Sequence, residues 1–165
     1  MKAGCRMTAD PTQATLPGRV LVTTDPLDPV AEQDDLTAGN TGIGAVCSFD
    51  GLVRAISDGP DSSLSLEHYP GMTERALEDI RQEAGQRWPL LGLSILHRVG
   101  RMGPGERIVS VIAASAHRQA AFDAAAFTMD YLKTRAPFWK LEDDGSGESE
   151  WVEARDSDDR AAAKW

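Results

Sequence analysis

Two lysines flank a tight corner in the C-terminal third of the chain. The helical pattern that runs up to Lys133 ends before Pro137, because proline has no backbone N–H to donate and restricts the residue before it. The following stretch predicts a strand that carries Phe138, Lys140 and Glu142 on one face. Two cations held on adjoining rigid elements are suited to binding an anion or to transferring a proton.

The same lysines also have a simpler interpretation. Lys133 lies at the border between the apolar and polar faces of its helix, and a border lysine usually lays its stem on the core with its amine in water. An amine buried beside another cation is instead a better proton donor or acceptor near neutral pH. Spacing alone favours the first interpretation. Phe138 and Trp139 are expected to pack in the core, since aromatic area usually serves packing.

A basic pair, His117-Arg118, opens the longest helical segment. Positive side chains at a helix N-terminus oppose the helix dipole by roughly 0.3–1 kcal/mol each. Free backbone N–H groups together with a basic pair form a candidate anion site. The alternative is that both side chains point into solvent or pair with nearby acids, and the local pattern favours this alternative.

Arg54 ends an apolar strand at the start of a loop. A guanidinium held there can form paired hydrogen bonds to a phosphate or a carboxylate, and Gly51 allows a close approach. The alternative is an edge arginine beside a β-bulge. Cys47, in the same strand, is more typical of a small buried hydrophobe than of a nucleophile.

Composition limits the class of protein. A chain of 165 residues fits one domain, and a net charge of −9 argues against non-specific binding to nucleic acid or anionic membranes. No apolar run has the length of a membrane span, and the first residues lack the apolar core of a secretory signal. Cys5 and Cys47 are far apart and belong to no metal-ligand motif. The sequence therefore predicts a cytoplasmic protein with no disulfide, metal or cofactor.

Periodicity and turn residues predict an α+β fold with mostly antiparallel strands. Residues 1–17 are expected to be disordered, 18–152 to form one domain, and 153–165 to form a loose tail. Within the domain, the expected helices cover 28–36, 72–88 and 117–133, and the expected strands cover 19–23, 43–53, 64–69, 91–97, 108–114, 138–142 and 151–152.

Two local details accompany this outline. The strands at 43–53 and 64–69 are expected to pair as a hairpin around a Gly-Pro-Asp turn. Ser115 is expected to cap the helix that follows it, because serine is a common N-cap residue.

None of these patterns is specific alone, but their ordered set resembles the catalytic (large) subunit of molybdopterin synthase. The resemblance covers about Val20 to Trp151. Its pieces are Gly44-Ala45, Phe49-x-Gly51-x-Val53-Arg54, Leu66-Glu67-His68-Tyr69 followed by Met72, His97-Arg98-Val99-Gly100, Gly105-Glu106, His117-Arg118, Phe122, Leu132-Lys133 and Pro137-Phe138-Trp139-Lys140-x-Glu142. The chain departs from the family at Leu141, where a second lysine is common, at Phe138, where an aliphatic residue is usual, and at Pro70-Gly71.

The resemblance implies a fold, an activity and partners. The implied fold is an α/β hammerhead with an additional antiparallel β subdomain. The implied enzyme is a sulfurtransferase of molybdenum cofactor biosynthesis, which inserts two sulfurs into cyclic pyranopterin monophosphate and so forms the molybdopterin dithiolene. The sulfur arrives as a C-terminal thiocarboxylate on a small β-grasp carrier subunit. Two large subunits form a central homodimer within a heterotetramer.

The resemblance also implies roles for particular residues. Arg54, His117 and Arg118 are expected to contact the phosphate and the pterin, with the His-Arg pair acting across the dimer interface. Leu52 and Val53 are expected to shape the wall of the site.

The reacting end of the substrate is assigned to the lysines. Lys133 and Lys140 are the expected catalytic residues, with Lys133 the first candidate. Leu141 and Glu142 complete the expected substrate-binding set, and Glu142 is expected to orient Lys140. The protein supplies no sulfur nucleophile, so both cysteines are expected to be dispensable.

Two alternatives remain open from the sequence. The first is a non-catalytic partner module that keeps the dimer and the carrier groove, which only Leu141 favours. The second is an enzyme of another class that uses a phosphorylated ligand, such as an acyltransferase, and needs no carrier. Both leave the ordered motif set unexplained.

Overall fold

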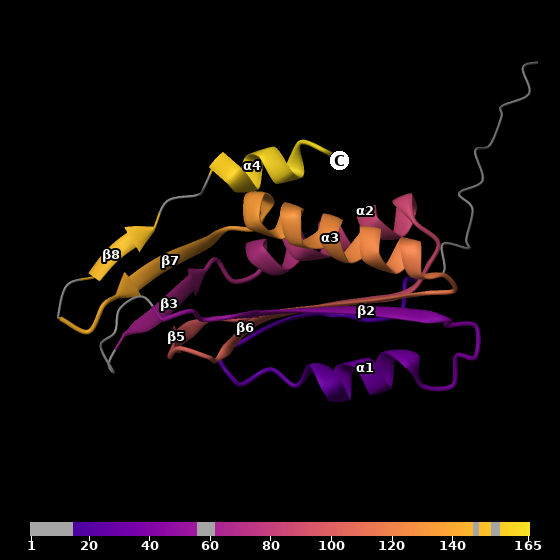
Figure 1. Cartoon of the computed structure of the whole chain (residues 1–165), viewed down its shortest axis with the longest axis horizontal. Coiled ribbons are helices and arrows are strands. Elements are labelled where there is room, and N and C mark those ends of the chain that lie inside the picture. Colours follow the sequence, from indigo (N-terminus) through magenta and orange to yellow (C-terminus); the bar gives the residue numbers. More distant parts are fainter. Residues whose placement is uncertain (1–14, 56–61, 147–148, 153–155) are drawn as a thin grey trace, which may run out of the picture.

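The described part of the chain contains two four-stranded sheets (Figure 1). The structure is a computed structural model that describes residues 15–55, 62–146, 149–152 and 156–165. Its elements are β1 (Val20–Thr23), α1 (Pro29–Thr37), β2 (Ala45–Leu52), β3 (Ser63–His68), α2 (Met72–Arg87), β4 (Leu90–Arg98), β5 (Gly100–Met102), β6 (Arg107–Ser115), α3 (Arg118–Arg135), β7 (Phe138–Asp143), β8 (Ser149–Val152) and α4 (Asp156–Ala162).

The larger sheet has the strand order β1-β4-β6-β2, in which only the β1–β4 pairing is parallel. The second sheet, β5-β3-β7-β8, is antiparallel and lies beyond one end of the first (Figure 1). Helix α1 covers one face of the larger sheet, α2 and α3 cover the other, and α4 lies on α3 (Figure 1). The predicted α+β class, with a hammerhead-like core and an added antiparallel subdomain, is confirmed. None of the described helices is long and apolar enough to cross a membrane.

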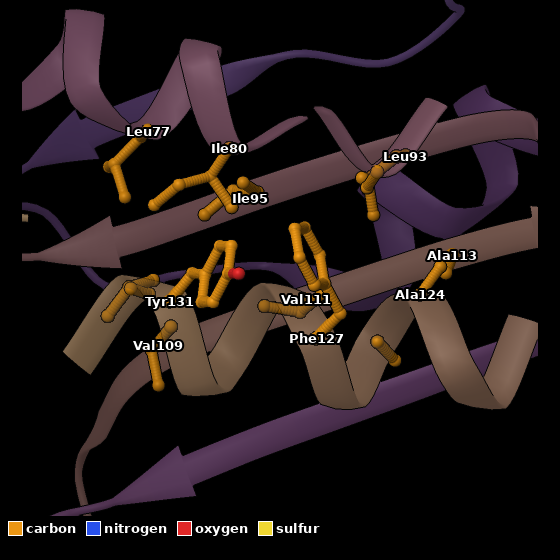
Figure 2. Packing of buried hydrophobic residues seen from close by; sticks show 13 residues of the cluster. Leu77, Ile80, Leu93, Ile95, Val109, Val111, Ala113, Ala124, Phe127 and Tyr131 are labelled. Carbon is orange, nitrogen blue, oxygen red and sulfur yellow. The ribbon is translucent and has the colours of Figure 1, made fainter. Parts of the chain in front are cut away.

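The main core lies between the larger sheet and the pair α2 and α3. Because strand residues alternate, β6 turns Val109, Val111 and Ala113 toward these helices, and it turns Ile112 and Ala114 toward α1. Figure 2 shows the first set facing the side chains that α2 and α3 contribute. The near-continuous apolar run of β6 is therefore typical of a strand buried on both faces.

Phe127 of α3 is the largest side chain of this core with no exposed surface. Its ring meets Trp88 at 5.2 Å between centroids, Tyr131 at 4.2 Å and Trp165 at 5.8 Å. Edge-on and tilted aromatic contacts of this kind add to the free energy gained by burying the ring. The contacts fix how α3 lies on the sheet, and with it the position of the lysine in its last turn.

The predicted hairpin between 43–53 and 64–69 is wrong. β2 pairs with β6, whereas β3 pairs with β5 and β7 in the other sheet. A turn between two strands serves a hairpin and a crossover between sheets equally well, so local residues do not distinguish them. The predicted turn at 59–61 lies outside the described residues.

The predicted cap at Ser115 is also wrong. Ser115 ends β6, and its hydroxyl donates to the carbonyl oxygen of Pro89 at 2.9 Å. The N-cap residue of α3 is His117, which has extended backbone and no side-chain capping bond. The strand simply continues further than its apolar pattern, because Ser115 pairs with Ala45 and Leu90.

Both expected unstructured ends need correction where they are described. Asp156–Ala162 form α4, and Trp165 packs on the core rather than lying in a loose tail. Leu16 also packs against the core, and its carbonyl oxygen accepts a 2.8 Å hydrogen bond from Arg81. In each case tertiary contacts hold a segment whose own pattern is too weak to indicate order. Residues 1–14 lie outside the described part of the chain.

The core packing predicts a large stability loss for Phe127→Ala. Removing a fully buried phenylalanine loses its transfer free energy and leaves a cavity, so the free energy of unfolding should fall by about 3–5 kcal/mol. Val30→Ala on α1, where the side chain is 69% exposed, is the control and should change it by roughly 0.5 kcal/mol or less. Chemical denaturation of both variants measures the difference, and a Phe127 loss close to that of Val30 would contradict this packing.

Candidate functional site

A cavity opens where α3 ends and the second sheet begins. Its volume is about 540 Å³, and a second hollow of about 290 Å³ adjoins it through shared lining residues. The larger cavity is lined by Phe49, Gly51, Leu52, Arg54, Leu64, Leu66, His97, Ile108, Val109, Met129, Leu132, Lys133, Ala136, Phe138, Lys140, Val152, Ser157 and Asp158. The smaller one is lined by Leu52, Val53, Arg54, Ala55, Leu64, Ile108, Lys140 and Glu142.

Strand geometry explains this position. The rows of β2, β4 and β6 that face α3 reach the cavity at Phe49, Gly51, His97 and Val109. The C-terminal part of α3, which ends at Arg135, forms one wall beside them. This end of the sheet therefore becomes the floor of a cavity.

Among the described residues, three cations from separate segments line the larger cavity. Arg54 follows β2, Lys133 lies in the last turn of α3, and Lys140 lies on β7. Pro137 sits at the corner between α3 and β7, as predicted, so both lysines can face one space. In a protein of net charge −9, this cavity is a local concentration of positive charge suited to an anionic ligand.

Each lysine has a carboxylate partner. Lys140 forms an ion pair with Glu142, two residues along the same strand face. Lys133 Nζ lies 3.5 Å from Asp158 Oδ1 of α4. The first pair was expected from alternation along the strand, whereas the second joins residues 25 positions apart. These carboxylates limit the net charge of the cavity and fix the directions of the amines.

His97 forms part of the apolar wall. It is 4% exposed, and its ring stacks on Phe138 with centroids 3.9 Å apart. Nδ1 lies 3.0 Å from the carbonyl oxygen of Arg98, so Nδ1 carries the proton and donates. Burial lowers the pKa of His97 from 6.5 to about 4, with the positive field of His68 a smaller cause. The imidazole is therefore neutral at physiological pH.

The described residues bring together only part of the predicted site. Arg54, Lys133, Lys140, Leu52, Val53 and Glu142 line the two hollows. Leu141 does not, because strand alternation turns it to the opposite face of β7 from Lys140.

His117 and Arg118 are also separate from the cavity within one chain. Both are exposed at the N-terminal end of α3. Arg118 and Lys133 are 15 positions apart, which places their backbones about 22 Å apart along the helix at 1.5 Å per residue. One chain therefore cannot bring both groups to the same small ligand, and the joint role assigned to them needs a second copy.

Several lining residues were not assigned by sequence reasoning. His97 had a usable signal, since a polar residue there ends the core-facing row that begins with Leu93 and Ile95. Asp158 had none, because its segment has no pattern that places it beside Lys133. Trp139 was expected in the core but is 49% exposed, on the same side of β7 as Leu141. Phe138 does pack against the core.

Cys47 does not resemble an activated thiol. It packs beside the main core, and partial burial raises the pKa of its thiol. A raised pKa reduces the thiolate fraction at neutral pH, and the thiolate is the nucleophilic form. Cys47 also does not line either hollow. Cys5 lies outside the described residues.

The comparisons with known proteins decide the family. The family model described as MoaE protein matches residues 22–135, which include Arg54, the His-Arg pair and Lys133. The chain belongs to the MoaE family. A protein of Pseudomonas aeruginosa named molybdopterin synthase catalytic subunit is 63% identical over 139 residues, covering 84% of this chain and 92% of the relative. A Mesorhizobium japonicum protein of the same name is 54% identical over 154 residues, covering 92% of this chain and 96% of the relative.

Solved structures agree with the family assignment. The molybdopterin cofactor biosynthesis protein E of Burkholderia multivorans is similar with a TM-score of 0.76 and 49% identity, covering 90% of this chain and 97% of that one. Molybdopterin synthase from Staphylococcus aureus gives a TM-score of 0.71 at 28% identity, with coverages of 82% and 96%. The likeness thus extends over nearly the whole length of each neighbour.

The lowered pKa of His97 predicts an acid-dependent loss of stability. Between pH 6.5 and about 4 the unfolded chain binds a proton at His97 that the folded chain does not, so stability falls as the pH falls. Relative to His97→Gln, the wild-type free energy of unfolding should decline by up to about 3 kcal/mol across this window. Denaturation curves at several pH values measure it. A wild-type stability that runs parallel to that of His97→Gln across this window would contradict the assignment.

Proposed function

We propose that this chain is the catalytic subunit of a molybdopterin synthase. In this proposal it transfers sulfur from the C-terminal thiocarboxylate of a small carrier subunit to cyclic pyranopterin monophosphate and so forms the dithiolene. The observation that carries the proposal is the convergence of Arg54, Lys133 and Lys140 on one cavity of an acidic protein. Family membership supports it, because the relatives are named as catalytic subunits of this enzyme.

Charge explains why such a site suits these reactants. The substrate carries a phosphate and the donor carries an anionic tail, so the cavity must hold two anions together. Arg54 offers a planar guanidinium, which binds phosphate through paired hydrogen bonds. Leu52 and Val53 supply apolar wall beside it, and Phe138 supplies aromatic surface for a flat pterin ring.

The two lysines act at the reacting end of the substrate. Their cations stabilise the charge that develops when the thiocarboxylate sulfur attacks, and one of them transfers a proton. Glu142 orients Lys140 through their ion pair. Lys133 remains the first candidate for the catalytic role, because its position in the last turn of α3 is fixed by the core.

The quaternary arrangement follows from the separation along α3. His117 and Arg118 serve the cavity of the other subunit in a central homodimer, and they add phosphate contacts there. A small β-grasp carrier subunit docks at each outer end, which gives a heterotetramer that works in the cytoplasm. The word subunit in the names of the relatives supports a second kind of chain.

The two other functions suggested by the sequence find less support. The non-catalytic module rested on Leu141, but this side chain faces away from the cavity and so leaves its cations unchanged. An acyltransferase that uses a phosphorylated ligand would need no carrier. Incubation of the purified protein with cyclic pyranopterin monophosphate and thiocarboxylated carrier tests all three. Dithiolene product supports the synthase, whereas its absence, or equal activity with a small-molecule donor alone, overturns it.

Lys133→Ala should abolish sulfur transfer, because it removes a cation from the reacting end. Binding of the carrier, measured by titration calorimetry, and the thermal unfolding midpoint should stay close to wild type. Arg75→Ala on α2 is the matched control, since it removes one exposed positive charge outside the cavity. Product formation by Lys133→Ala at a rate near that of Arg75→Ala would remove the catalytic assignment.

Subunit mixing tests the role of Arg118 across the interface. Arg118→Ala and Lys133→Ala should each be inactive as pure proteins, Arg118→Ala through weakened substrate binding. Half of randomly mixed dimers contain one of each, and each such dimer keeps one intact site, so refolding an equal mixture should restore roughly a quarter of wild-type activity. No recovery from a mixture shown to contain mixed dimers would place Arg118 outside the partner's site.

A further inference from the structure

The last residue of the chain is anchored outside the cavity. The indole of Trp165 meets the rings of Trp88 and Phe127 edge-on, with centroids 5.6 and 5.8 Å apart. Its Nε1–H donates to Asp130 at 2.8 Å, and Arg87 donates to its carbonyl oxygen at 2.8 Å. An aromatic side chain with a packed body and a hydrogen-bonded polar edge is a firm attachment. We call this set of contacts the Trp165 anchor.

The other end of α4 reaches the cavity. Ser157 and Asp158 belong to its lining, and Asp158 is the residue that meets Lys133. Lys133 keeps 52% of its side chain exposed, so packing does little to fix its amine. A lysine side chain has four rotatable bonds and loses considerable conformational entropy when it is held in one geometry. The carboxylate of Asp158 gives the ammonium one preferred direction.

Stability alone does not account for this pair. An exposed ion pair contributes little to the free energy of folding. It is also not needed to hold α4, because the Trp165 anchor and Ala162 already pack this helix on the core. The anchor thus determines where α4 lies, and the weak ion pair follows from that position. The ion pair therefore influences where the Lys133 amine lies, but it does not determine whether α4 packs on the protein.

We propose that Asp158 is a positioning residue for Lys133, and that the Trp165 anchor holds Asp158 in place. The inference rests on the proposed function, in which Lys133 acts on the substrate. It assigns a kinetic role to Asp158 and Trp165, which no pattern in the sequence indicated. Because Asp158 acts through another side chain, its removal should affect the chemical step more than substrate binding.

Asp158→Asn tests the first half, because it keeps the shape and removes the charge. We expect kcat for dithiolene formation to fall by about tenfold, as a misplaced catalytic group does, while KM for the pterin changes by less than about twofold. Asp158→Glu should recover part of the lost kcat. Asp159→Asn is the matched control, since it removes the same charge from an exposed neighbour on α4. Equal kcat for the two asparagine variants, a change confined to KM, or a higher kcat for Asp158→Asn would each overturn the proposal.

Trp165→Ala tests the second half. It should raise amide hydrogen exchange across Asp156–Ala162 and lower kcat to the level of Asp158→Asn, whereas Asp158→Asn should leave that exchange unchanged. The double variant should lose no more kcat than either single one, because both changes act through one contact. Additive losses would overturn the coupling. If circular dichroism shows that Trp165→Ala is unfolded, Trp165→Leu, which keeps apolar bulk, replaces it in the same comparison.

The outcomes separate this inference from the proposed function. Absence of product from the wild-type protein counts against the function itself. Wild-type turnover with indistinguishable Asp158 and Asp159 variants overturns only the positioning role. The exchange measurement needs no turnover, so unchanged exchange in a folded Trp165→Ala protein refutes the anchor whatever the activity.

Discussion

The packing of α3 on the larger sheet is the constraint on which the site depends. Its buried face, centred on Phe127, fixes the direction of an 18-residue helix. The position of this helix then determines where the basic residues of the candidate site lie. Its last turn carries Lys133, the corner after it leads to Lys140 on β7, and its first residue is Arg118. The helix thus sets both what one chain brings together and what it keeps apart.

That separation supports the proposed homodimer, in which the site draws on residues of two chains. Arg118 and Lys133 lie at opposite ends of α3, and bending this helix to bring them together would break its core contacts. A symmetric pair of chains avoids this cost, because each can present one end of its helix to the other's cavity. The exposure of His117 and Arg118 in a single chain is what such an arrangement requires.

Much of this could be predicted from sequence, for identifiable reasons. The boundaries of α2, β4 and β7 follow from strong periodicity and from Pro137, and those elements agree with the prediction within one or two residues. The Lys140–Glu142 pair follows from alternation along one strand. These patterns depend only on residues close together in the sequence, so they can be recognised without knowledge of the fold.

The wrong strand pairing and the missed C-terminal contacts both depend on residues far apart in the sequence. Whether β2 pairs with β3 or with β6 depends on contacts between segments far apart in the sequence, and the turn residues between β2 and β3 do not encode those contacts. Likewise, residues 156–165 have too little apolar pattern to predict a packed segment, since their order comes from contacts of Trp165 with Trp88 and Phe127. Asp158 was missed for the same reason, because its partner lies 25 residues away.

The two ends of α4 are attached to the rest of the protein with different strengths. Exposed ion pairs are each worth only about 0–1 kcal/mol, so a short helix held by Asp158 and Lys133 alone would detach readily. Placing the attachment at Trp165, on apolar surface outside the cavity, leaves the cavity side free of strong internal contacts. An anionic ligand can then compete for the cations without having to displace a tightly bound segment. A strong anchor combined with a weak contact keeps Lys133 directed and still available.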